Sequence, residues 1–107
     1  MEKNSITYEA CDTGETITTE KKYTKLPYKL NEITIGSTSE KIVNPFSGES
    51  YELDAVEEAV YSVIKGAEWS LNMDTSPVPN SLAQTMFQDG MDWFRINNTR
   101  AYMTLLD

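Results

Sequence analysis

The stretch from Lys41 to Leu71 constrains the fold most strongly, because it predicts a β-hairpin that continues directly into an amphipathic helix. Residues 41–43 form a short apolar strand, and residues 51–53 alternate between apolar and polar side chains as the return strand. The intervening residues 44–48 are Asn-Pro-Phe-Ser-Gly. In such a turn the asparagine side chain caps the backbone, proline presets φ, and glycine accepts the left-handed conformation.

A helix is predicted over Ala55–Leu71. Asp54 and Glu57 have the spacing of a capping box, and Glu58 adds a favourable interaction with the helix dipole. Apolar residues recur at intervals of three and four, which places them on one face of the helix. This face comprises Val56, Ala59, Val60, Val63, Ile64, Ala67 and Leu71. We expect the rest of the chain to cover this face or to extend from it.

A second helix is predicted from Ser81, which forms a capping box with Gln84, to about Asn97. Packing against the first helix and the sheet is one interpretation of its wide apolar face, and a surface shared with another subunit or a partner helix is the other. Gly90 either allows a close neighbour or marks a kink. Thr99 is expected to cap a last short helix. The apolar face comprises Leu82, Ala83, Met86, Phe87, Met91, Trp93, Phe94 and Ile96.

The chain of 107 residues is long enough for one domain with one hydrophobic core. Strand-like alternation is confined to the first half of the chain, and helical periodicity to the second. We therefore predict an α+β fold. It has a small antiparallel sheet or hairpins in the N-terminal half and two to three packed helices in the C-terminal half.

The first forty residues are more polar than the remainder. Residues 6–10 and 16–19 predict a hairpin, and residues 31–36 predict a further strand. A hairpin with so few apolar residues is marginally stable by itself. We therefore divide the chain into an extended or strand-like arm of residues 1–40, which gains order by pairing with another chain, and a globular core of residues 41–107.

The net charge of −8 argues against nucleic acid and anionic membrane surfaces as direct partners. Lysines are interleaved with the carboxylates, which favours acidity as a source of solubility over mimicry of nucleic acid. The sequence shows no secretory signal and no run of about 20 apolar residues, so we expect no membrane span.

The residues that usually carry chemistry are absent or isolated. The chain has no histidine and one cysteine, Cys11, which removes the usual structural zinc sites. Its five glycines are scattered and form no phosphate-binding loop. Asp89 and Asp92 lie one turn apart on the second helix, but no third ligand or proton partner is recognisable. We predict no catalytic residue, no cofactor and no metal site, and therefore a protein that is not an enzyme.

Six apolar or aromatic residues are candidates for a partner interface. Pro27 cannot donate to a sheet, so the segment of residues 20–29 is either an edge strand or a crossing arm. A large ring at the tip of the hairpin either folds back onto the core or is left for a partner. The candidate residues are Tyr23, Leu26, Tyr28, Phe46, Trp69 and Trp93.

Three segments carry a resemblance to a known group of proteins. They are residues 44–49, residues 53–68 and residues 92–107. Through them the chain resembles small uncharacterised proteins encoded by tailed bacteriophages, over roughly residues 42–107. The resemblance implies a setting in the host cytoplasm or in the virion, and it transfers no functional residue.

Together these features predict a non-enzymatic protein–protein interaction module, and the resemblance implies a phage-encoded minor virion or assembly component. Its partner would be a virion protein, a host protein or a second copy of the chain. The alternative is an acidic phage-encoded inhibitor that binds a host or defence protein, including at a site that normally holds nucleic acid. Binding through charge weakens as salt rises, whereas a packed virion contact does not.

Overall fold

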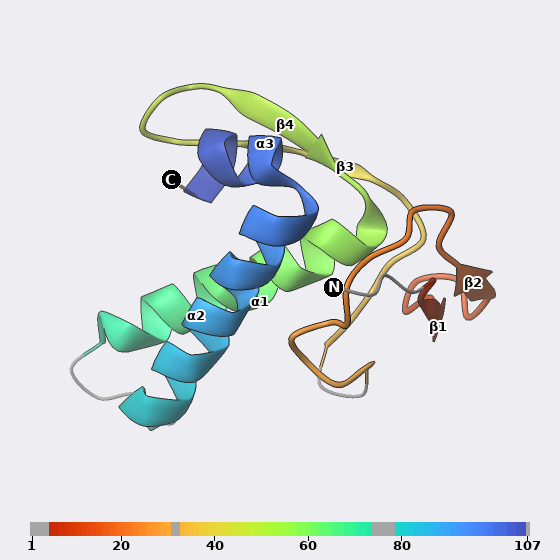
Figure 1. The fold of residues 1–107 in the computed structure, drawn as a ribbon, viewed down its shortest axis with the longest axis horizontal. Coiled ribbons are helices and arrows are strands. Elements are labelled where there is room, and N and C mark those ends of the chain that lie inside the picture. Colours follow the sequence, from red (N-terminus) through yellow and green to blue (C-terminus); the bar gives the residue numbers. More distant parts are fainter. Residues whose placement is uncertain (1–4, 31–32, 74–78, 107) are drawn as a thin grey trace.

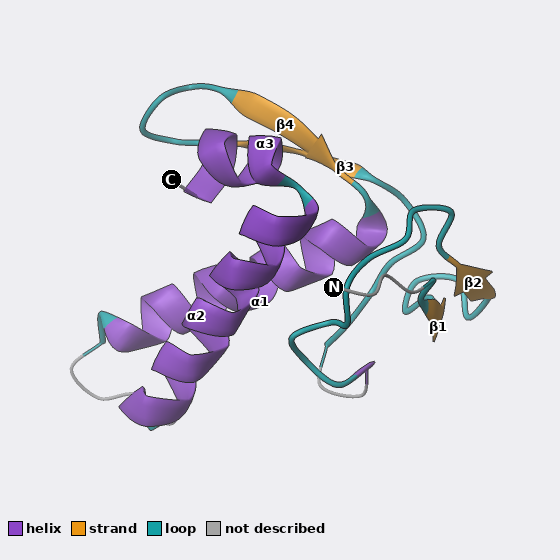
Figure 2. Ribbon diagram, in the orientation of Figure 1, coloured by secondary structure: helices purple, strands orange, loops and turns teal. Residues whose placement is uncertain are grey.

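The computed structural model describes residues 5–30, 33–73 and 79–106. Within these residues, two hairpins precede the helices along the chain (Figure 1). The predicted α+β fold is therefore confirmed (Figure 2). The elements are β1 (Thr7–Glu9), β2 (Thr16–Thr18), β3 (Glu40–Val43), β4 (Ser50–Leu53), α1 (Ala55–Leu71), α2 (Asn80–Asn97), α3 (Thr99–Ala101) and the π-helical turn η2 (Tyr102–Leu106).

The two hairpins form separate two-stranded antiparallel sheets within the described residues. Tyr8 pairs with Ile17 in the first sheet, and Ile42 pairs with Tyr51 in the second. Figure 1 shows the first sheet near the end of the molecule where α1 begins, and the second sheet beside α3. Both predicted hairpins are present, although they do not join into one sheet.

The helix predicted over Ala55–Leu71 is confirmed at both ends. The Glu57 backbone N–H donates to the Asp54 carboxylate at 2.8 Å, and the Asp54 N–H donates to the Glu57 carboxylate at 3.1 Å. The expected capping box is therefore formed. Every residue of the predicted apolar face is buried or half-buried.

Helix α2 begins at Asn80, and its expected capping box is wrong. Pro79 occupies the N-cap position, and its carbonyl accepts a hydrogen bond from the Ala83 N–H at 3.0 Å. Ser81 therefore lies inside the first turn and makes no cap with Gln84. The physical reason is Pro79: at the N-cap its missing N–H costs no intrahelical hydrogen bond, so the helix starts ahead of Ser81.

Asn98, and not the expected Thr99, caps the last helix. The Ala101 N–H donates to the Asn98 side-chain oxygen at 3.2 Å, and the Asn98 amide donates to Glu57 Oε2 at 2.7 Å. The Thr99 hydroxyl donates instead to the Arg95 carbonyl at 2.7 Å. The Asn98 side chain accepts a hydrogen bond from the first turn of the last helix and donates one to the buried Glu57 carboxylate. Asn98 therefore replaces Thr99 as the cap.

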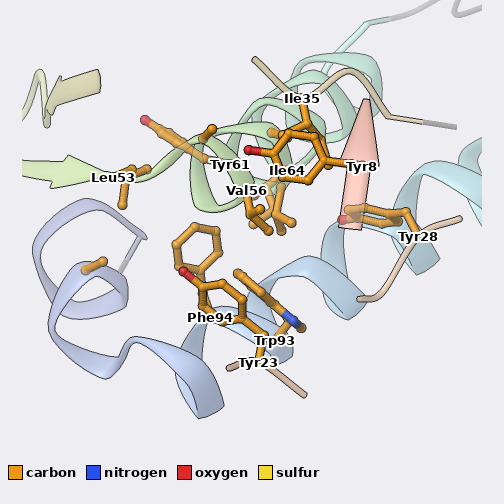
Figure 3. Close-up of a cluster of buried hydrophobic side chains, with 14 of the residues drawn as sticks. Tyr8, Tyr23, Tyr28, Ile35, Leu53, Val56, Tyr61, Ile64, Trp93 and Phe94 are labelled. Atoms are coloured by element: carbon orange, nitrogen blue, oxygen red, sulfur yellow. The ribbon is translucent and has the colours of Figure 1, made fainter. Parts of the chain in front are cut away.

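A single core contains buried residues from both halves of the chain. Helices α1 and α2 lie side by side in opposite directions (Figure 1), with Ile64 and Phe94 fully shielded from solvent. Figure 3 shows aromatic side chains from the N-terminal segment packed around this helix pair. The N-terminal contributions to the core are Tyr8, Ala10, Tyr23, Tyr28 and Ile35.

These contacts contradict the expected division into an arm of residues 1–40 and a core of residues 41–107. The Tyr23 hydroxyl donates to the Asp54 carboxylate, and the Tyr28 hydroxyl donates to the Met86 carbonyl at 2.5 Å. A buried tyrosine needs such a partner for its hydroxyl while its ring packs among apolar groups. The polar N-terminal sequence therefore joins the same interior through tyrosines instead of aliphatic residues.

The segment of residues 20–29 crosses α2 and is not an edge strand. The Thr24 N–H donates to Asn97 Oδ1 at 2.9 Å, and Asn97 Nδ2 donates to Thr24 Oγ1 at 2.7 Å. The strand expected over residues 31–36 is not formed in residues 33–36, and residues 31–32 lie outside the described residues. Ile35 nevertheless joins the core, and its carbonyl accepts a hydrogen bond from the Cys11 N–H at 2.9 Å.

Gly90 allows α1 and Tyr28 to approach α2 closely. A Cβ atom at this position would lie 2.5 Å from Ile64 Cγ1 and would collide with the Tyr28 hydroxyl. Cβ atoms essentially never come this close to a neighbouring heavy atom. Of the two roles expected for Gly90, the close neighbour is therefore confirmed.

Candidate protein-binding surface

The turn between β3 and β4 is organised by Asn44. Its backbone N–H donates to the Glu49 carbonyl at 2.8 Å, and its carbonyl accepts from the Gly48 N–H at 2.8 Å. Its side-chain oxygen accepts from the Phe46 N–H at 2.9 Å, the arrangement of an Asx turn. Gly48 has φ of +77°, which glycine adopts without strain. One residue therefore fixes the conformation of the whole turn.

Asn44 also attaches the turn to the C-terminal helical segment. Its side-chain Nδ2 donates to the Thr104 carbonyl in η2 at 3.0 Å. Strand β4 packs against η2 as well, and Figure 1 shows this hairpin lying beside α3. The turn is thus held by its own strands and by a second element.

Phe46 projects from this turn with 95% of its surface exposed. Of the two positions expected for its ring, the structure has the one that leaves it outside the core. Val43 and Met103 are exposed too, and they directly precede Asn44 and Thr104, which are joined by the hydrogen bond described above. Phe46 is therefore an exposed ring on a turn whose backbone is fixed, with further exposed apolar residues in the two elements that hold the turn.

Three of the expected interface residues lie in the core, so their assignment to an interface is wrong. Tyr23 and Trp93 have ring centroids 5.1 Å apart, and the Trp93 Nε1–H donates to the Thr24 carbonyl at 3.4 Å. Tyr28 packs over Gly90. Figure 3 shows all three rings directed into the interior. Each has an internal partner for its polar atom, and this lets the ring be buried.

The remaining expected residues are Leu26 and Trp69. Leu26 is half-buried and packs against the core. Trp69 lies in the last part of α1 and is 67% exposed. Trp69 therefore remains available to a partner, although it belongs to a different element from Phe46.

Glu57 is a carboxylate that the fold encloses, since only 1% of it is exposed. Besides the hydrogen bonds from the Asp54 N–H and the Asn98 amide, its Oε1 lies 3.6 Å from Lys21 Nζ. A buried carboxylate is destabilising without such partners. Glu57 joins the N-terminal segment, α1 and α3, and its contacts account for it as a structural group.

Asp89 and Asp92 line a shallow cleft of about 260 Å³ beside Trp93. The Asp92 carboxylate accepts hydrogen bonds from the Arg95 guanidinium at 2.7 Å and from the Gln88 amide at 3.1 Å. Among the described residues, no group of three or more side chains is arranged to hold a metal ion. The contacts of Asp92 are those of a solvated ion pair on a helix face.

Two phenols of the N-terminal segment are held in their neutral form. Burial raises the pKa of Tyr23, and the hydrogen bond to Asp54 and the charge of Glu57 raise this pKa further. Burial also raises the pKa of Tyr28, with a smaller contribution from the charge of Asp89. Both hydroxyls therefore remain proton donors to their partners.

No protein-family model, curated protein or solved structure matches this chain. Within the part of the chain that the structure describes, no helix is long and apolar enough to cross a membrane. Any assignment of function must therefore start from the surface itself.

The sequence did not indicate three residues of this surface, namely Asn44 as an anchor, Val43 and Met103. Asn44 was recognisable as a turn residue, but its hydrogen bond to Thr104 joins residues 60 positions apart. The alternation of β3 was the available signal for Val43, because residues next to one another in a strand point to opposite faces. The helical spacing of Ala101, Tyr102, Leu105 and Leu106 leaves Met103 off their face, but it does not indicate that η2 contacts the turn.

Proposed function

We propose that this chain is a non-enzymatic protein-binding module whose contact surface is the turn of residues 44–48. The observation that carries the proposal is Phe46, an exposed ring on a turn fixed by hydrogen bonds. The resemblance of residues 42–107 to phage proteins supports a minor virion or assembly component, in the host cytoplasm or the virion. No active-site geometry is needed for this role.

Energetics favour Phe46 as an anchor. Full burial of a phenylalanine side chain contributes about 1.5–3 kcal/mol. The turn loses little conformational entropy on binding, because Asn44 already holds it in one conformation. Binding energy commonly concentrates in a few central residues of this kind, surrounded by contacts that exclude water. Val43 and Met103 are further exposed apolar residues of the elements that hold the turn.

A photoreactive phenylalanine analogue at position 46 tests the proposal. Introduced in the native host, it should form a cross-link to one protein species, which mass spectrometry then identifies. A cross-link to a second copy of the chain would identify self-association as the interaction. Absence of a cross-link from position 46, with a strong one from position 69, would contradict the assignment to the turn.

Calorimetric titration of the identified partner then measures the contribution of Phe46. The Phe46→Ser variant should bind about 30-fold more weakly, the effect of an anchor worth about 2 kcal/mol. Trp69→Ser is the matched control, since it removes another exposed aromatic ring and should leave the affinity unchanged. Equal affinity of Phe46→Ser and the unmodified protein would contradict the proposal. Affinity that collapses with rising salt would favour the acidic inhibitor instead.

A further inference from the structure

A groove of about 550 Å³ lies between the N-terminal strand and the crossing segment. Residues 5–7 form one wall, and residues 25–30 form the other. Its size falls in the range of cavities that hold ligands. None of the residues that line the groove belongs to the turn that presents Phe46.

Thr7 in the first wall belongs to β1, and its backbone groups have no partner among the described residues. Within the described residues, β1 pairs only with β2. The Thr19 N–H donates to the Ile6 carbonyl, and the Ala10 N–H donates to the Glu15 carbonyl. Because backbone groups in an antiparallel strand alternate between its two sides, the N–H and C=O of Thr7 point away from β2. The side-chain contact of Thr7 with Thr18, at 3.0 Å between hydroxyl oxygens, is consistent with this register.

The second wall does not satisfy these backbone groups. Pro27 has no N–H to donate, and the segment around it is not a strand. Leu26 and Pro27 are half-buried, Tyr28 is buried, and Leu30 is exposed. The wall therefore provides an apolar surface across the groove from Thr7, whose outward backbone groups are unpaired among the described residues. An added strand can pair with such groups and pack its side chains on such a surface.

The charge of the groove is opposite to that of the whole protein. Lys25 and Lys29 line it and are exposed. Neither forms an ion pair with a described residue, whereas Lys21 lies 3.7 Å from Asp54 and 3.6 Å from Glu57. In a chain with a net charge of −8, two lysines that have no ion pair among the described residues and lie beside an apolar wall favour an acidic ligand.

We propose that this groove binds an extended peptide segment of a partner protein in which acidic and apolar residues alternate. The peptide adds a strand to the free edge of β1 through the backbone of Thr7. One face of the added strand places apolar side chains against Leu26 and Tyr28. Its carboxylates interact with Lys25 and Lys29. The site is a second binding surface, separate from the turn of residues 44–48.

Fluorescence anisotropy with a dye-labelled heptapeptide of alternating glutamate and valine tests the proposal. The unmodified protein should bind this peptide at least about tenfold more tightly than the same peptide with lysine in place of glutamate. A version that is N-methylated on the edge facing β1 should lose binding, because it cannot pair with a strand. Equal binding of all three peptides would overturn the proposal.

Variants of the protein locate the site. The double variant Lys25→Glu/Lys29→Glu should weaken binding about tenfold, while Lys22→Glu, which changes charge in the same segment outside the groove, should have little effect. The free energy of unfolding should be the same for all, since these lysines are exposed and have no ion pair among the described residues. If the Lys22→Glu variant lost as much peptide affinity as the double variant, the peptide would be held by non-specific charge attraction and not by the groove. That result would overturn the proposal.

Two further readouts separate this site from the proposed function. Bound peptide should protect the Thr7 amide from hydrogen exchange, and Phe46→Ser should bind the peptide as tightly as the unmodified protein. If the Phe46→Ser variant lost peptide binding, the peptide would bind at the turn of residues 44–48, and binding in the groove would be contradicted. Sedimentation that shows a dimer dissociated by the peptide would identify the strand of a second copy as the native occupant, which would contradict a partner peptide.

Discussion

Gly90 determines how closely three parts of the chain approach one another. Ile64 of α1 and Tyr28 of the crossing segment both occupy the space where a Cβ atom would lie. The Tyr28 hydroxyl can then reach the Met86 carbonyl one turn earlier on α2. The absence of one side chain thus allows both the helix pair and its N-terminal cover to pack.

Replacing Gly90 by alanine is therefore expected to destabilise the protein by about 1–3 kcal/mol, the usual effect of overpacking a core. Gly66→Ala is the matched control, since nothing lies within 4 Å of its Cβ position in the same helix pair. That substitution should stabilise the protein by about 0.5–1 kcal/mol through helix propensity. Urea denaturation measures the free energy of unfolding of both variants. If Gly90→Ala were as stable as Gly66→Ala, the close approach of Ile64 and Tyr28 to Gly90 would be contradicted.

Residues whose structure is determined by near neighbours in the chain could be predicted from the sequence. The Asp54–Glu57 capping box joins residues three positions apart, and it formed as predicted. The burial of Tyr23 and Tyr28 was missed because their hydroxyls bond to partners 31 and 58 positions away. For Phe46 the sequence allowed either a ring packed on the core or an exposed ring. Neighbouring residues in the chain do not determine which of the two an aromatic side chain in a turn adopts.

At the scale of elements, the start of α1 is where three segments meet. Glu57 accepts hydrogen bonds from the Asp54 N–H and from the Asn98 amide, and it lies near Lys21. The N-terminal segment and the start of α3 therefore depend on the same carboxylate. This dependence could not be predicted, because the sequence shows the cap but not the side chains that reach it from elsewhere.

Glu57→Ala should consequently destabilise the protein by about 1–3 kcal/mol, because it leaves the Asn98 amide and the Asp54 N–H without their acceptor. Glu58→Ala is the control, as it removes a neighbouring carboxylate of the same helix turn whose partner is the Ser62 hydroxyl near the surface. We expect a change of about 0.5 kcal/mol or less for this variant. Thermal denaturation measures the stability of the two variants. Equal destabilisation by Glu57→Ala and Glu58→Ala would contradict the role of Glu57 as the shared acceptor of these segments.

The start of α2 shows how two local signals compete. Ser81 and Gln84 have the spacing of a capping box, yet Pro79 opens the helix before them. The existence and end of α2 were predictable from its apolar period, and its first residue depended on which signal prevailed. The two hairpins were also predictable from turn residues, whereas their separation into two sheets depends on contacts that the turns do not encode.

At the scale of the whole molecule, the N-terminal segment is part of the core and the turn of residues 44–48 lies outside it. The tyrosines of the first forty residues cover the helix pair that the remaining chain forms (Figure 3). The expected arm would have supplied the binding function. Because this segment is part of the core, the binding surfaces that we propose are the turn of Phe46 and the groove beside Thr7.

Native-state hydrogen exchange of the full chain tests this integration most directly. The Thr24 amide donates to Asn97 Oδ1 at 2.9 Å and belongs to the N-terminal segment, and the Ile64 amide lies in the middle of α1. One shared core predicts that both amides exchange only through global unfolding, with free energies of opening that agree within about 1 kcal/mol. Exchange of the Thr24 amide at the unprotected rate, while Ile64 remains protected, would contradict the account.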